Sequence, residues 1–238
     1  LALMVGLTTE DRLDFECQDC TLLWLDDGLE ATTAVVRPPN GNATLYTDGR
    51  SITPGALPQR VLTPFLVAPV FDRVLSIGFG SGQLAAMMAE NYPDTQVDCV
   101  ELDGNMAQTT EFFGTTDLFS RSNFELFVDD GRQHMLRSPQ TYDVILADTF
   151  THSINTQIYG SGFFEVAREA LTEEGSFFIT VPLQDLPSQT EAEIILRTAA
   201  ESFSHAYVIA PQGMVGIIGR SQPLDIDRGI RGLPQTLQ

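Results

Sequence analysis

The chain is 238 residues long, which allows one large domain or one domain with an appendage. Its hydrophobic content of 43% and charged content of 19% are typical of a soluble globular protein. The net charge is −19, and all 13 basic residues are arginine. Such a surface repels nucleic-acid phosphates and anionic membranes, so we expect no nucleic-acid partner. Solubility or a salt-adapted source explains this charge better than substrate steering does.

The N-terminus and the cysteines carry few signals. The opening LALMVGL is too short for a membrane span and lacks the basic start of a signal peptide, although it could be left from something upstream. Cys17 and Cys20 form a C-x-x-C with no second pair, which favours a disulfide or a stray pair over a metal site. Cys99 is predicted to be buried and to pack as an apolar side chain. No metal is predicted.

The first patterned segment is β-rich. Strands are predicted at Thr21 to Leu25, Ala31 to Arg37 and Ala43 to Thr47, separated by turns rich in Asp, Gly, Pro and Asn. They predict a small antiparallel sheet that ends at Asp48-Gly49. Leu57 to Val70 is predicted to be helical in spite of three prolines. We therefore divide the chain into an N-terminal segment with a small sheet, residues 1–53, and an α/β domain, residues 54–238.

The stretch FDRVLSIGFGSGQLAAMMAENYPDTQVDCVELD, residues 71–103, has the order of half a nucleotide-binding unit. A buried strand, Val74 to Ile77, precedes three glycines spaced G-x-G-x-G, a helix, Leu84 to Glu90, and a second strand, Gln96 to Leu102. The glycines Gly78, Gly80 and Gly82 let the backbone turn sharply and approach a ligand. Position 83 is Gln rather than a third glycine, so the spacing favours an S-adenosylmethionine type of site over a dinucleotide site.

Strands and helices alternate through the rest of the chain. The predicted strands are Phe124 to Val128, Tyr142 to Ala147 and Ser176 to Val181, and His205 to Ala210 and Met214 to Gly219 close the sheet as an antiparallel pair if Gln212-Gly213 is their turn. The predicted helices are Asn105 to Phe113, Arg132 to Leu136, Phe163 to Leu171 and Glu191 to Ser202. Residues 114–123 and 149–160 are predicted to be irregular. This alternation predicts a parallel sheet with helices on both faces.

Carboxylates follow three of these strands. Glu101, Asp130 and Asp148 each stand at a predicted strand end, as the glycines do. Each alone is as easily explained as a helix cap. Ligands of open α/β sheets bind at the carboxyl ends of the strands, so the coincidence of all of them predicts one shared site.

The sequence also resembles a known family. The succession LYTDG, VLSIGFGSGQL, CVELD, FVDDGRQHM, YDVILAD and EEGSFF resembles the spermidine synthase-like family, over roughly residues 21–220 by elements aligned by eye. The resemblance implies a methyltransferase-type, Rossmann-like fold behind a small N-terminal sheet. The stretch DDGLEATTAVVRPPNGNATLYTDG looks most like members fused behind membrane-spanning segments.

The resemblance implies roles for individual residues. Glu101 would hold the ribose hydroxyls, and Asp130, in a D-D-G that replaces the family's G-D-G or G-D-A, would contact the adenine amino group. Gln59 would face the ligand from the preceding helix. The remaining implied cofactor-binding residues are those of the loop, namely Gly78, Gly80, Ser81 and Gly82.

Departures from the family pattern affect the acceptor side. Ser81 stands where the family usually has an Asp that helps to hold the ammonium of decarboxylated S-adenosylmethionine. Asp148-Thr149-Phe150-Thr151 replaces D-S-S-D, so the second Asp, usually credited with orienting or deprotonating the amine, is a Thr. A Tyr common near position 57 is Leu. Asp148, with His152, remains as the candidate catalytic pair, although a loop His is more often a surface residue.

Four functions follow from these patterns. The first is transfer of an aminopropyl or 3-amino-3-carboxypropyl group from decarboxylated or full S-adenosylmethionine to an amine, such as a polyamine, with release of methylthioadenosine. The second is a lyase or cyclising reaction without an external acceptor. The third is methyl transfer, and the fourth is a sensor domain that binds the nucleoside without turnover. Fold alone does not decide among them. The resemblance also allows a homodimer, and a cytoplasmic protein that is either free or tethered at the inner face of a membrane as the soluble part of a longer one.

Overall fold

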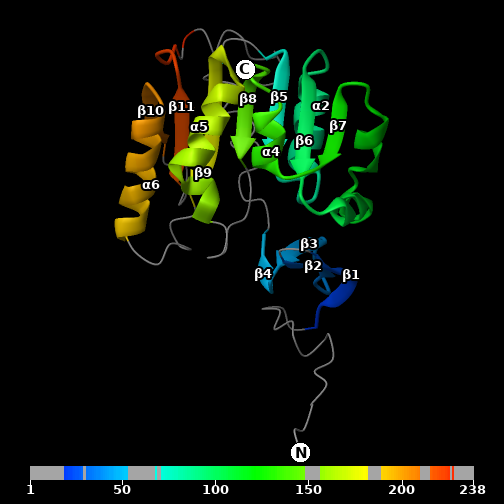
Figure 1. Cartoon of the computed structure of the whole chain (residues 1–238). Coiled ribbons are helices and arrows are strands. Elements are labelled where there is room, and N and C mark those ends of the chain that lie inside the picture. Colours follow the sequence, from blue (N-terminus) through cyan, green and yellow to red (C-terminus); the bar gives the residue numbers. More distant parts are fainter. Residues whose placement is uncertain are drawn as a thin grey trace, which may run out of the picture.

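A computed structural model describes residues 19–28, 31–52, 68, 71–147, 156–181, 189–209, 215–225 and 227 of the chain. Within these ranges the strands form a small sheet and a large sheet (Figure 1). The predicted helix from 57 to 70, the Gln212-Gly213 turn and Cys17 lie outside the described residues. Cys20 is disulfide-bonded, whereas Cys99 is free and buried.

The small sheet is antiparallel in the order β1-β2-β3-β4. Its strands are β1 (Thr21–Asp27), β2 (Thr32–Arg37), β3 (Thr44–Thr47) and β4 (Arg50–Ser51). The first three match the predicted strands, whereas β4 continues the sheet past its predicted end at Asp48-Gly49. The chain reverses there because Asp48 and Gly49 both adopt positive φ angles, 49° and 78°, so two further residues pair with β3.

The large sheet has seven strands in the order β10-β11-β9-β8-β5-β6-β7. Its strands are β5 (Arg73–Ile77), β6 (Gln96–Glu101), β7 (Phe124–Val128), β8 (Tyr142–Ala147), β9 (Leu171–Val181), β10 (His205–Ile209) and β11 (Val215–Arg220). Neighbours from β7 to β9 are parallel, and β11 and β10 add an antiparallel pair at one end. Strand order reverses at β5, whose two neighbours are β6 and β8, and this is where such sheets bind ligands.

Helices cover both faces of the large sheet. They are α2 (Gln83–Asn91), α4 (Gly131–Leu136), α5 (Ser161–Ala170) and α6 (Gln189–Ser202). Successive strand residues point to opposite faces, so Val74 packs in the core shared with α2, whereas Leu75 packs in the core shared with α4, α5 and α6. The predicted fold class is therefore confirmed: a Rossmann-like parallel sheet with helices on both faces, a closing antiparallel hairpin and a small N-terminal sheet.

Two predicted elements differ from the structure. Residues predicted as one helix from Asn105 to Phe113 form a 3₁₀ helix, η2 (Gly104–Thr109), followed by one short turn, α3 (Thr110–Phe113). The hydroxyls of Thr109 and Thr110 donate to the carbonyl oxygens of Met106 and Ala107, at 2.7 and 2.8 Å, and such local bonds compete with α-helical ones. Residues 114–123, which were predicted to be irregular, contain a further 3₁₀ helix, η3 (Thr116–Ser120).

The strand predicted from Ser176 begins earlier, at Leu171. Its register against β8 shifts between the pairs Tyr142↔Leu171 and Val144↔Ser176, so residues 172–175 form an irregularity inside a longer strand. A Cβ at Gly175 would lie 3.0 Å from the carbonyl oxygen of Tyr142, which explains why a glycine occupies this close approach.

The small sheet lies beyond one end of the strands of the large sheet (Figure 1). Val35 and Leu45 belong to the same apolar core as Phe79 and Leu84, and a Cβ at Gly80 would lie 3.9 Å from Leu45 Cδ2. Trp24 Nε1 donates to Gln108 Oε1 at 3.3 Å. The N-terminal sheet therefore covers part of the edge where ligands of the large sheet would bind. No helix among the described residues has both the length and the apolar character needed to cross a membrane.

Candidate nucleoside-binding site

The loop after β5 takes the shape that its glycines predict. Gly78, Gly80 and Gly82 all have positive φ angles, of 95°, 55° and 72°. At Gly82 a Cβ would also lie 2.8 Å from Phe79 Cζ and 3.2 Å from Thr110 Cγ2, so both the backbone conformation and the packing require glycine there. The loop leads directly into α2, which begins at Gln83.

Glu101 joins the end of β6 to this loop. Its Oε2 accepts a hydrogen bond from Phe79 N at 2.9 Å, and its Oε1 accepts one from Asp103 N at 3.2 Å. The side chain stays partly exposed, and each carboxylate oxygen has a second lone pair for a further donor. Two adjacent ribose hydroxyls are donors that this arrangement could serve.

Asp130 stands at the next strand end along the sheet. Its Oδ1 accepts from Gln133 N at 2.8 Å, so it is the N-cap of α4, and its side chain is exposed. Asp129 N donates to Glu101 O at 3.0 Å, which fastens the turn after β7 to the end of β6. The glycine loop, Glu101 and Asp130 thus follow three neighbouring parallel strands and lie along one edge.

Two threonines that sequence reasoning missed hold the glycine loop. Thr115 Oγ1 donates to Ser81 O at 3.0 Å. Thr109 Oγ1 lies 2.9 Å from Gly80 O and shares its single proton between this oxygen and Met106 O. Ser81 Oγ itself donates to Gln83 Oε1 at 3.1 Å. Both threonines lie in the segment from η2 to η3, which was predicted to be a helix followed by an irregular connection. No sequence motif identifies them, because their partners are backbone carbonyls, which every residue has.

The predicted catalytic residues Asp148 and His152, and the predicted ligand contact Gln59, lie outside the described residues. Their roles stay predictions. Among the described residues, no group of three or more His, Cys, Asp or Glu side chains is arranged to hold a metal ion.

A carboxylate pair lies where the small sheet meets the end of β6. Burial, followed by a hydrogen bond to Asp103, raises the pKa of Asp26 above its ordinary value. Asn105 Nδ2 donates to Asp26 Oδ1 at 3.1 Å, and Asn105 N donates to Asp103 Oδ1 at 2.9 Å. Asp103 can approach the end of β1 because residue 28 is a glycine, since a Cβ at Gly28 would collide with Asp103 Oδ2. The end of β1, Asp26-Asp27, with Gly28, is therefore also the joint between the two sheets, although the sequence predicted these residues as a turn.

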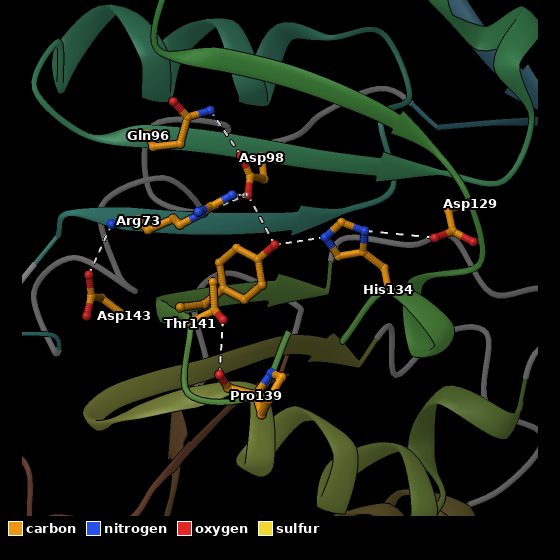
Figure 2. Close-up of polar contacts among 9 residues, drawn as sticks. Arg73, Gln96, Asp98, Asp129, His134, Pro139, Thr141 and Asp143 are labelled. Atoms are coloured by element: carbon orange, nitrogen blue, oxygen red, sulfur yellow. Dashed lines mark hydrogen bonds and ion pairs between the residues drawn. The ribbon is translucent and has the colours of Figure 1, made fainter. Parts of the chain in front are cut away.

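A buried polar network lies beneath α4 (Figure 2). Asp98, in the middle of β6, has no exposed surface, and its Oδ2 accepts from Arg73 Nε at 2.9 Å and from Tyr142 Oη at 3.1 Å. Gln96 Nε2 donates to the other oxygen at 3.0 Å. Burial, with the charge of Asp98, raises the pKa of Tyr142.

The network continues into α4 through His134, whose Nε2 lies 2.8 Å from Tyr142 Oη. Burial is the main cause that lowers the pKa of His134. Sequence reasoning singled out neither Asp98 nor His134, although an Asp inside an otherwise apolar strand, QVDCVE, was a signal that a buried partner must exist.

Together, this topology and edge define an α/β protein of the methyltransferase type with a candidate nucleoside site at the ends of β5, β6 and β7. Residues 63–218 match the spermine/spermidine synthase domain, which is more than half of the chain. The chain belongs to the spermine/spermidine synthase family.

Curated relatives agree with this family. The polyamine aminopropyltransferase of Vibrio vulnificus is 30% identical over 141 residues, which are 56% of this chain and 46% of the relative. The polyamine aminopropyltransferase of Bacillus subtilis is 25% identical over 118 residues, 48% of this chain and 42% of the relative. The chain thus spans less than half the length of these relatives in the matched regions.

Solved structures establish the fold. Spermidine synthase from Thermotoga maritima superposes with a TM-score of 0.74 at 17% identity, over 91% of this chain and 79% of that one. A spermidine synthase in complex with the transition-state analogue AdoDATO gives 0.77 at 16% identity, over 91% and 80%. Human methyltransferase-like protein 13 in complex with SAH gives 0.60 at 20% identity, over 76% and 89%.

Proposed function

We propose that this chain transfers an aminopropyl-type group from a sulfonium nucleoside, decarboxylated or full S-adenosylmethionine, to an amine and releases methylthioadenosine. The observation that carries the proposal is the convergence of the glycine loop, Glu101 and Asp130 on one edge. Membership of the spermine/spermidine synthase family supports it.

Each candidate site residue has a part in this proposal. Glu101 accepts the two ribose hydroxyls, Asp130 accepts the adenine amino group, and the loop from Gly78 to Gly82 passes close to the sulfonium tail, with Ser81 at its turn. Gln59 would add a polar contact to the ligand. The amine nitrogen attacks the carbon next to the sulfonium, the C–S bond breaks, and the sulfur leaves with its electron pair as methylthioadenosine.

The amine must attack in its unprotonated form. In this proposal Asp148 aligns it and accepts its proton, and His152 assists. The carboxylates of the proposed site, Glu101, Asp130 and Asp148, and the net charge of −19 suit a cationic acceptor such as a polyamine.

Calorimetry and mass spectrometry test the proposal together. The parent should bind methylthioadenosine, and Glu101→Gln and Asp130→Asn should each weaken binding at least about tenfold, as expected for a lost charge-assisted hydrogen bond. Incubation with a donor and a polyamine should yield methylthioadenosine and the alkylated amine. Unchanged binding in both variants, or no product from any pairing of donor and amine, would reject it.

The uncharged loop favours a second candidate. Ser81 donates to Gln83 Oε1 at 3.1 Å, and residues 78–83, GFGSGQ, contain no carboxylate that would repel the carboxylate of full S-adenosylmethionine. Lyase or cyclising chemistry on that donor would release methylthioadenosine without an amine. The same assay with the donor alone decides this, since no product without an amine rejects it. S-adenosylhomocysteine as the product would instead indicate methyl transfer.

A further inference from the structure

The carboxylate of Asp129 links the two ends of α4. Its Oδ1 accepts from the backbone amide of Asp130, the N-cap of this helix, at 2.9 Å. Its Oδ2 pairs with Nη2 of Arg137, the C-cap residue of the same helix. A six-residue helix has little stability of its own, so its position depends on such contacts.

The middle of α4 is held from beneath. The Asp98 carboxylate can only accept, so it takes the hydroxyl proton of Tyr142, and the Tyr142 oxygen in turn accepts the proton of His134 Nε2. His134 is then a neutral imidazole protonated on Nε2, and its Nδ1 lies 3.9 Å from Asp129 Oδ2 without a hydrogen bond between them. Burial lowers the pKa of His134 and so favours its neutral form, whereas Arg137 pairs directly with Asp129 and balances its charge.

The start of α4 also sits tightly on the sheet. A Cβ at Gly131 would lie 2.7 Å from Ile77 Cγ2, so the helix begins against the end of β5. Asp130 lies between this contact and Asp129. The direction of its exposed carboxylate is therefore set by the bond from Gln133 N and by the backbone of residues 129–131, where the Asp130 amide has Asp129 as its acceptor.

We propose that Asp129 is a positioning residue that orients Asp130 toward the nucleobase. It holds the Asp130 amide, is neutralised by Arg137, and stands on a helix that the Asp98–Tyr142–His134 network fixes to the sheet. Asp129 does not itself touch the ligand. The inference rests on the proposed function, because it gives Asp130 its ligand.

Calorimetry with methylthioadenosine tests this with two substitutions at one position. Asp129→Ala removes the acceptor of the Asp130 amide and should weaken binding about tenfold, the effect of one hydrogen bond. Asp129→Asn keeps an amide oxygen that accepts the same bond, so binding should weaken no more than about threefold. With the donor saturating, kcat should change less than about twofold in both variants, because the reacting groups are untouched.

Asp117→Ala is the matched control, since Asp117 also pairs with an arginine, Arg121, at 3.5 Å, but in η3 and away from Asp130. Its binding should equal that of the parent. If Asp130→Asn weakens binding but Asp129→Ala does not, or if Asp129→Asn is as weak as Asp129→Ala, the positioning role is wrong while the proposed site stands. If the parent, Glu101→Gln and Asp130→Asn all bind alike, or none binds, the proposed function fails and this inference fails with it.

Discussion

Asp98 and Arg73 form an ion pair with unequal surroundings. The Asp98 side chain has no exposed surface, whereas 42% of the Arg73 side chain is exposed, and their closest atoms are 2.7 Å apart. Arg73 also lies over the Tyr142 ring, 5.7 Å from its centroid. A buried charge that loses its partner cannot be rehydrated without rearrangement, whereas a half-exposed one can.

This asymmetry predicts unequal costs of breaking the pair. Arg73→Met leaves an uncompensated buried carboxylate and should lower the free energy of unfolding by about 3–5 kcal/mol. Asp98→Asn leaves a guanidinium that water can reach and should cost about 1–3 kcal/mol. Urea unfolding measures both, with Arg121→Met as the control for loss of an exposed pair, expected below about 1 kcal/mol. Equal costs at the two positions would contradict the prediction.

His134 makes stability depend on pH in a definite direction. Because burial lowers its pKa below the ordinary 6.5, the native protein binds this proton less readily than the unfolded chain does. The contribution of neutral His134 to the free energy of unfolding is therefore complete above pH 6.5 and is lost as the pH falls through the pKa of His134 in the folded state. His134→Gln should therefore lose less stability than the parent on acidification.

Urea unfolding at about pH 7.5 and about pH 5 measures this, with the difference between parent and variant isolating one histidine from the titrating carboxylates. His205→Gln, on β10, controls for the loss of a histidine as such. If both variants respond to acid in the same way, His134 is not the group responsible.

At the scale of elements, periodicity predicted most of the large sheet. The run from β5 to β6 and the strand β8 were predicted within a residue or two, because buried parallel strands read as short apolar runs bounded by Gly, Asn, Asp and Pro. The segment from η2 to η3 was not, since hydroxyl-to-carbonyl bonds of threonines override helical propensity there. The early start of β9 depends on its partner β8, which no local pattern reveals.

A comparison of two glycines distinguishes the cost of backbone strain from the cost of a packing collision. Gly82 and Gly114 both have positive φ angles, 72° and 69°, but a Cβ at Gly114 has nothing within 4 Å whereas one at Gly82 collides with Phe79. Gly114→Ala should cost only the left-handed strain, about 1–2 kcal/mol. Gly82→Ala should cost more and should also weaken methylthioadenosine binding, because the loop must shift. Thermal unfolding and calorimetry check this, and equal stability losses would argue against the collision.

At the scale of the whole molecule, parallel topology is what made the candidate site predictable. Because parallel strands end at one edge, Glu101 and Asp130 could be placed side by side from their positions after strands. The residues that support the glycine loop, the Asp130 amide and the joint between the two sheets could not be predicted. Thr115 and Asp129 act through backbone groups, and Asp26 acts across the joint between two sheets, so their partners depend on tertiary structure.

The net charge of −19 is a property of the whole molecule and predicts a response to salt. With 32 acidic and 13 basic residues, the compact state concentrates negative charge that the unfolded chain disperses. The screening length falls from about 10 Å at 0.1 M salt to about 3 Å at 1 M, so added NaCl weakens this repulsion. We expect stability to rise by about 1 kcal/mol, or about 2–4 °C in Tm, over that range.

A variant with fewer surface carboxylates provides the matched comparison. Glu90, Asp94, Glu111 and Glu193 are exposed and are not among the candidate site residues, so replacing them with Gln or Asn lowers the charge without touching the core. The variant should be more stable than the parent at low salt and should gain less from NaCl, because less repulsion remains to be screened. Thermal unfolding across a NaCl series measures both curves. Parallel curves would show that salt acts through preferential exclusion rather than through the protein's own charge.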